Sequence, residues 1–152
     1  MADQSHNKAG FWPLNPNARL TYMPMKASVA LAAGDLVILT SNQVDLALAA
    51  SAELTGVIAE STTTAVAAGT LVGVYADANE KFVGKTSGAN ALAVGAACDI
   101  EGGTGAMLVN ENATSTNVLL AHGAYDPEEV DTSAGRRQIV SIRLASQVEV
   151  SS

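Results

Sequence analysis

The side chains that could perform a reaction are few and lie far apart in the sequence. Cys98, the single cysteine, and His122 could in principle form a nucleophile and its base. Cys98 follows Gly95-Ala96-Ala97 in an apolar stretch, however, and a lone cysteine in such a setting is usually inert packing. No other grouping of serine, histidine and acidic residues suggests acyl transfer. The sequence therefore predicts no nucleophilic site.

Two glycine-containing segments begin to match phosphate-binding motifs without completing them. Gly84-Lys85-Thr86 has the ending of a phosphate-binding loop, but Asn79 stands where that motif requires a glycine. We interpret this segment as a hairpin turn. Residues 102–105 lack the later glycine of a dinucleotide-binding fingerprint and are also interpreted as a turn. Neither segment predicts a nucleotide cofactor.

Metal ligands are equally sparse. One cysteine and two histidines cannot make a zinc site unaided. Residues 77–81 begin like a calcium loop, but Phe82 replaces the glycine that such a loop requires. The acidic stretch 126–131 could hold a hard cation, or it could be a solvated loop that Arg136 and Arg137 balance. We predict no catalytic residue, no metal site and no cofactor, and we do not expect an enzyme.

The elements that would position these side chains have the pattern of β-strands. Hydrophobic residues make up 48% of the 152-residue chain, aromatic residues only 4%, and there are 13 glycines. Residues 35–40 form a short apolar run after Ala-Gly, as a buried strand does. Residues 44–48 alternate with period two, although an alanine-rich helical turn over 45–53 is the competing interpretation. Further candidate strands cover residues 55–60, 70–76, 81–85, 106–109 and 117–121.

The clearest candidate strand is the C-terminal segment 138–150. Most of its apolar residues share one parity, and its polar residues Ser141, Arg143, Gln147 and Glu149 share the other, which predicts one buried and one wet face. Because the run exceeds the usual strand length of roughly 5–6 residues, we expect a bend near Ala145-Ser146. Clusters of Gly, Asn, Ser and Thr separate the candidates at short intervals. Short strands separated by such turn residues are typical of an all-β sandwich or barrel.

Residues 1–26 differ from residues 27–152 and are predicted to form an extended N-terminal arm ahead of one β-rich domain. They hold three of the four prolines and three of the six aromatic residues, so neither a helix nor a central strand is expected. The arm either packs along its own domain or anchors on a neighbouring molecule. The candidate partner-binding residues are Phe11, Trp12, Pro13, Leu14, Pro16, Arg19, Leu20 and Tyr22.

Charge narrows the classes of partner. The net charge is −7, and residues 27–152 carry five basic against fourteen acidic groups. Nucleic-acid binding is therefore not expected, because affinity for phosphates comes from clustered Lys and Arg. No apolar run approaches the ~20 residues of a spanning helix, and the first ten residues have no signal-like hydrophobic stretch. We expect a soluble protein in a reducing compartment, without membrane contact.

Residues 25–77 resemble the head decoration and capsid cement proteins of tailed bacteriophages. The order of pieces matches: a proline-containing leader, the entry strand 32–39, the alternating segment 44–48, then segments 54–60 and 67–75. The resemblance implies a small β-barrel-like, or tulip, fold. It also implies an oligomer, typically a homotrimer and sometimes another oligomer, that is made in the bacterial host cytoplasm. Such an oligomer sits on the outer capsid surface and binds the major capsid protein where subunits meet.

The alternative is a receptor- or glycan-binding β domain of a virion spike or a surface appendage. Such a domain would be expected to present aromatic side chains for stacking on sugars. Beyond the arm, only Tyr75, Phe82 and Tyr125 could do so. A capsid-binding protein, which needs matching surfaces and no reacting group, is therefore the favoured hypothesis.

Overall fold

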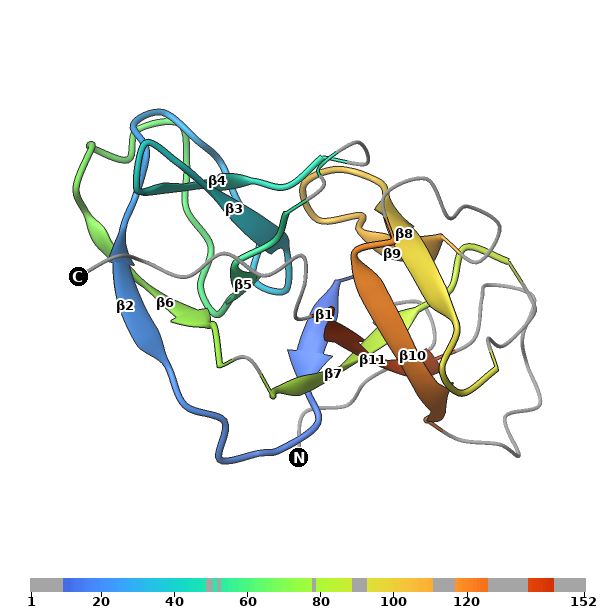
Figure 1. Cartoon of the computed structure of the whole chain (residues 1–152). Coiled ribbons are helices and arrows are strands. Elements are labelled where there is room, and N and C mark those ends of the chain that lie inside the picture. Colours follow the sequence, from blue (N-terminus) through green and yellow to red (C-terminus); the bar gives the residue numbers. More distant parts are fainter. Residues whose placement is uncertain are drawn as a thin grey trace.

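A computed structural model describes residues 10–48, 51, 53–77, 79–88, 93–110, 117–125 and 137–143 of the chain. The all-β prediction is confirmed, since every regular element in these ranges is a strand (Figure 1). The first six strands are β1 (Phe11–Pro13), β2 (Thr21–Pro24), β3 (Leu36–Thr40), β4 (Gln43–Leu46), β5 (Gly56–Ile58) and β6 (Leu71–Tyr75). The others are β7 (Lys81–Lys85), β8 (Ala97–Glu101), β9 (Leu108–Asn110), β10 (Leu119–Ala124) and β11 (Arg137–Ile142).

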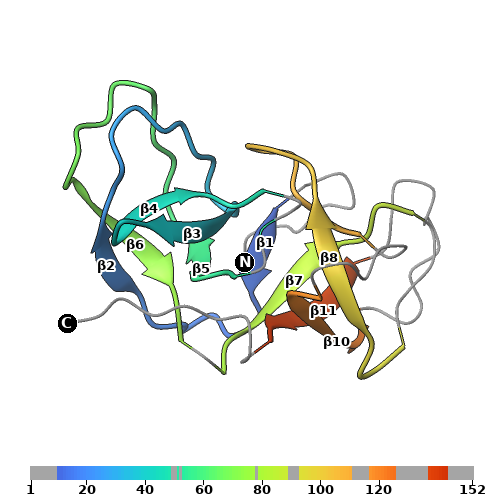
Figure 2. The same ribbon diagram turned by 45° about the horizontal axis from the view of Figure 1, so that its top comes forward.

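The strands form two antiparallel sheets that lie side by side (Figures 1 and 2). The six-stranded sheet has the order β1-β7-β11-β10-β8-β9, and the five-stranded sheet has the order β2-β6-β5-β3-β4. The first described strand belongs to the six-stranded sheet, the next five strands form the whole five-stranded sheet, and β7 to β11 complete the six-stranded one. As a result β1, the first strand, pairs with β7 from the second half of the chain, with Trp12 opposite Val83.

Neither sheet closes into the barrel that the resemblance implied. The five-stranded sheet curls until its outer strands meet at a single parallel bridge, Met25 with Val44. In the six-stranded sheet, Thr86, directly after β7, forms a parallel bridge with Val109 of the outer strand β9. The ladder stops there because Pro24 ends β2 without an N–H donor and because β9 is only three residues long. The correct description is two strongly curved open sheets.

Backbone hydrogen bonds from neighbouring segments also cover part of the free edges of the sheets. In the six-stranded sheet, the Phe11 N–H donates to the Gly34 carbonyl at 2.8 Å, and the Ser87 N–H donates to the Val109 carbonyl at 2.9 Å. In the five-stranded sheet, the Lys26 N–H donates to the Val44 carbonyl at 3.0 Å and so ties the end of β2 to β4. The described edges are therefore covered in part by the chain itself.

Two hydrophobic clusters hold the sheets. The first joins them, because Leu36 and Val57 of the five-stranded sheet pack with Phe82, Ile100 and Val140 of the six-stranded one. The second lies inside the five-stranded sheet. Its members are Met23, Met25, Leu31, Val37, Val44, Ile58, Val72 and Val74. Strand β3 sends Leu36 to one cluster and Val37 to the other, which explains its uninterrupted apolar run.

A buried carboxylate fastens the two sheets at the turn before β3. Asp35 is 1% exposed, and its Oδ2 accepts a hydrogen bond from the Ala32 N–H at 2.9 Å. Its Oδ1 accepts another from the Gly105 N–H at 3.0 Å, in the turn between β8 and β9. The Gly10 N–H donates to the Met107 carbonyl at 2.9 Å, so the start of β1 reaches the same place. Three distant parts of the chain thus meet here.

Most predicted strands are present. Strand β3 falls within the predicted 35–40, and β7 coincides with 81–85. Residues 43–46 are strand, so the helical alternative is wrong there. The C-terminal strand is described only as β11. The expected bend near Ala145-Ser146 lies outside the described residues.

Candidate interaction surface

The structure does not assemble the imagined nucleophile pair. Cys98 is 1% exposed in the core that joins the sheets. Burial, and then the charge of Asp99, raises the pKa of its thiol to about 12, so the thiol stays protonated. His122 lies at the bulge in β10, and its Nε2 is 2.8 Å from Ser141 Oγ on β11. Its hydrogen-bond partner is thus a serine on the next strand and not the cysteine.

The motif fragments also have structural roles. Gly84 and Lys85 lie inside strand β7, so the prediction of a hairpin turn at 84–86 is wrong. A Cβ at Gly84 would overlap the Phe11 ring, which leaves no room for a phosphate beside that backbone. Residues 104–105 are a turn, as expected.

The segment 77–81, which begins like a calcium-binding loop, forms a local turn in which an Asp side chain bonds the backbone. Asp77 Oδ1 accepts a hydrogen bond from the Asn79 N–H at 3.1 Å, a local Asx turn. Within the described part of the chain, no group of three or more His, Cys, Asp or Glu side chains could hold a metal ion. The acidic stretch 126–131 lies outside the described residues.

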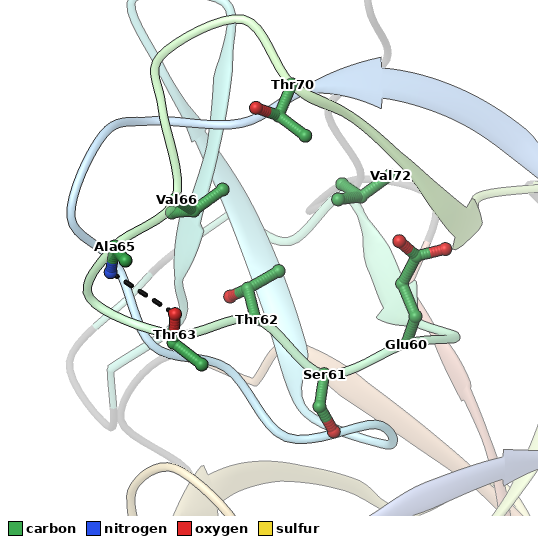
Figure 3. A pocket seen from close by; sticks show the side chains of 8 residues that line it. All are labelled: Glu60, Ser61, Thr62, Thr63, Ala65, Val66, Thr70 and Val72. Atoms are coloured by element: carbon green, nitrogen blue, oxygen red, sulfur yellow. Dashed lines mark hydrogen bonds between the residues drawn. The ribbon is translucent and has the colours of Figure 1, made fainter.

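A shallow pocket of about 320 Å³ is lined by residues around Thr62 and Thr70 (Figure 3). Its hydroxyl groups are used by the surrounding loops. Thr62 Oγ1 accepts from the Leu31 N–H at 3.0 Å and donates to the Val29 carbonyl at 2.8 Å. Thr70 Oγ1 donates to the Ala67 carbonyl at 2.8 Å. The pocket therefore offers one carboxylate, Glu60, and no paired acid and base.

The predicted arm is largely part of the domain. Phe11 is fully buried in the core, and Trp12 and Pro13 are half-buried in β1. Phe11 therefore cannot be a partner contact in this structure, which corrects that prediction. In the described residues, β1 and β2 of the predicted arm are strands of the two sheets. Both are outer strands, as the prolines required; residues 1–9 lie outside the described ranges.

The remaining candidates are exposed. Leu14, Pro16, Arg19 and Leu20 lie on the crossover that links β1 to β2, and Tyr22 follows on β2. Figure 1 shows this crossover as a curved connection that runs from one sheet to the other. Leu14 is 40% exposed and Tyr22 is 61% exposed. Of the predicted contact residues, those on the crossover and Tyr22 are therefore exposed, whereas the three residues of β1 are buried or half-buried.

Two of these side chains meet on the outward face of β2 and β6. Tyr22 lies opposite Gly73, and a Cβ at Gly73 would be 3.4 Å from Leu20 Cδ1 and 3.6 Å from Tyr22 Cε1. Leu71, opposite Pro24, is 61% exposed on the same face. We call Leu20, Tyr22, Pro24, Leu71 and Gly73 the β2–β6 surface. Val72 and Val74 alternate with these residues and fill the core.

Sequence reasoning missed Leu71 in this surface. Its signal was the alternation in β6, where Leu71 and Gly73 share one parity and the buried valines the other. Because both faces of β6 carry apolar residues, the alternation alone does not tell which face is buried and which is exposed. Only the pairing with β2 shows that Leu71 and Tyr22 share a face.

Comparison with known proteins adds no relative: no protein-family model matches the chain, and no curated protein is significantly similar to it. In the described ranges, no helix is long and apolar enough to cross a membrane.

Proposed function

We propose that this chain is a structural virion protein that binds the outer surface of a tailed-phage head where capsid subunits meet, and stabilises the shell. The observation that carries the proposal is the β2–β6 surface, where Leu20, Tyr22 and Leu71 are exposed together on one sheet face. Clustered exposed apolar side chains mark interaction sites. The resemblance of residues 25–77 to head decoration proteins supports the choice of partner.

The size of this surface bears on the number of copies. Leu20, Tyr22 and Leu71 are 36%, 61% and 61% exposed. Covering what remains exposed of them is worth roughly 2–5 kcal/mol, because full burial of such a side chain gives ~1.5–3 kcal/mol. A dissociation constant of 1 mM already corresponds to about 4 kcal/mol. One contact is therefore weak, and linked copies, such as the proposed homotrimer, supply the avidity.

The test uses undecorated heads of the phage that encodes this chain. The purified protein is mixed with the heads and sedimented, and bound copies are counted by gel densitometry. We expect the triple variant Leu20→Ser, Tyr22→Ser, Leu71→Ser to lose at least about tenfold in affinity, since it removes most of the apolar contact.

The matched control is Leu48→Ser with Val94→Ser, which removes exposed apolar side chains that are 60% and 75% exposed elsewhere. This control should bind as the wild type does. The proposal fails if the wild type does not sediment with heads, or if the triple variant binds equally well. Binding of glycans by the wild type in place of heads would support the receptor-binding alternative.

A further inference from the structure

The pocket in Figure 3 has apolar groups on its inner side. Val72 of β6 belongs to the second hydrophobic cluster, and Val66 packs against that cluster. Figure 3 shows the methyl carbons of Thr62 and Thr70 turned toward Val72, and their hydroxyl oxygens turned away from it. We call Glu60, Thr62, Val66, Thr70 and Val72 the Glu60 pocket. Its wall can contact an aliphatic chain.

The polar groups of the Glu60 pocket accept hydrogen bonds. Thr62 Oγ1 donates its hydrogen to the Val29 carbonyl at 2.8 Å, and Thr70 Oγ1 donates to the Ala67 carbonyl at 2.8 Å. A hydroxyl has one hydrogen, so both oxygens can only accept further bonds, as the Glu60 carboxylate does. These groups favour a positively charged donor and disfavour a phosphate or a carboxylate.

The charge of Glu60 has no counter-ion among the described residues. The described ion pair joins Lys26 Nζ to Asp45 Oδ2 at 3.2 Å and does not involve Glu60. In Figure 3 the Glu60 carboxyl group extends toward Val72, so this charge lies beside the apolar wall. Beyond residue 26 the chain has five basic and fourteen acidic residues, and its negative field favours the approach of a cation.

Backbone hydrogen bonds hold the wall of the Glu60 pocket in place without a ligand. The Thr62 N–H donates to the Leu31 carbonyl at 2.9 Å, and the Ser28 N–H donates to the Val66 carbonyl at 3.0 Å. The Val66 N–H donates to the Thr63 carbonyl at 3.0 Å. A wall that is already ordered loses little conformational freedom when a ligand binds.

We infer that the Glu60 pocket binds the side chain of a lysine from a partner protein. Lysine has an ammonium group with three donors and no acceptor, at the end of an aliphatic four-carbon stem. The stem matches the wall formed by Val66 and Val72, and the ammonium group matches the Glu60 carboxylate. Arginine carries the same charge, but its wide planar head matches a single compact charge site less well.

This contact is separate from the β2–β6 surface. Val72 lines the Glu60 pocket, whereas Leu71 lies on the opposite face of β6 and is exposed there. If the proposed function holds, the lysine belongs to the head shell. The test below needs no heads, so it can fail independently of that function.

The full chain, labelled with ¹⁵N, is titrated with Nα-acetyl-lysine amide and followed by nuclear magnetic resonance. An exposed ion pair is weak, so the titration extends to millimolar concentrations of the probe. We expect saturable shifts of the amide signals of residues 60–66 and 70–72. The Nε-acetylated form of the same probe, which has no charge, should cause no saturable shift.

The decisive variant is Glu60→Gln, and we expect its affinity for the lysine probe to fall at least about threefold. Glu60→Lys should abolish saturable binding, because it places a like charge at the pocket. The matched controls are Glu53→Gln and Glu53→Lys, which change the net charge equally at an exposed position that does not line the pocket. Both controls should bind as the wild type does.

Three results would overturn the inference: no saturable shift with the lysine probe, equal binding of its Nε-acetylated form, or an equal loss in the Glu53 variants. Tighter binding of n-butylammonium than of the lysine probe would overturn the assignment to a protein side chain. Tighter binding of Nα-acetyl-arginine amide would overturn the choice of lysine.

Discussion

Gly84 and Phe11 show how single residues join the N-terminal strand β1 to the middle of the chain. Phe11 is fully buried, and its ring lies against the backbone of Gly84 on the neighbouring strand. Any side chain at position 84 would displace that ring from the core. A glycine is therefore required here for space, since its backbone conformation is one that other residues also adopt.

We predict that Gly84→Ala lowers the free energy of unfolding by roughly 1–3 kcal/mol, the usual cost of overpacking a core. The control is Gly73→Ala, whose new Cβ would meet only the flexible ends of Leu20 and Tyr22, at 3.4 Å and beyond. That variant should stay within about 0.5 kcal/mol of the wild type. Urea denaturation measures both. Equal effects of the two substitutions would contradict the packing described for Phe11.

The sequence predicted the type of these residues better than their surroundings. Hydrophobicity marked Phe11, Leu20 and Tyr22 alike as contact residues, but only Leu20 and Tyr22 are exposed. Burial depends on β7, which lies some 70 residues further along the chain and pairs with Phe11. Cys98 was interpreted correctly as buried packing because its apolar neighbours are local in the sequence.

Among the elements, those bounded by glycine turns and rich in aliphatic residues were predictable. Strands β3 and β6 are of this kind, since they follow Gly34 and Gly69. Strand β8 (Ala97–Glu101) was missed because Asp99 and Glu101 interrupt its apolar pattern. Asp99 is nevertheless 4% exposed, and its Oδ1 accepts a hydrogen bond from the Asn117 N–H at 2.8 Å. A buried, satisfied carboxylate does not show itself in a hydrophobicity pattern.

The turn before β3 gives a prediction about pH. Burial raises the pKa of Asp35 above its ordinary 3.8, and this outweighs the hydrogen bonds from Ala32 and Gly105, which lower it. A carboxyl whose pKa is raised in the folded state stabilises the fold below its unfolded pKa. This stability is lost as the pH rises through the folded pKa. The contribution of Asp35 is therefore largest in acid and smaller at pH 7.

Asp35→Asn removes this titration and leaves at least one backbone N–H without its acceptor. We expect the variant to be less stable than the wild type by roughly 1–3 kcal/mol at pH 7, the cost of an unpaired buried group. The gap should widen as the pH falls toward about 4, because only the wild type gains stability there. Urea denaturation at several pH values measures the gap. A gap that stays constant or narrows in acid would contradict the account.

At the scale of the whole molecule, the two sheets share the larger of the two hydrophobic clusters. Leu36 and Val57 from one sheet pack with Phe82 and Val140 from the other, and β1 ties the N-terminal part to β7. Unfolding of either sheet would therefore expose this shared cluster, which favours unfolding of the two sheets together.

We predict a single cooperative unfolding transition for the full chain. Trp12 fluorescence reports on the six-stranded sheet, and far-ultraviolet circular dichroism reports on both sheets. The two urea curves should coincide, as they do for two-state domains of fewer than ~150 residues. Separate midpoints would mean that the sheets unfold independently and that the shared core contributes little.

The covered strand edges matter when many copies are held close together. Backbone hydrogen bonds to Phe11, Val109 and Val44 cover part of the free edges of β1, β9 and β4. Along these three described strands, crowded molecules therefore offer one another no long row of unpaired amides, the template from which fibrous aggregates grow. A dense coat of such molecules can thus remain a set of discrete, separately folded units.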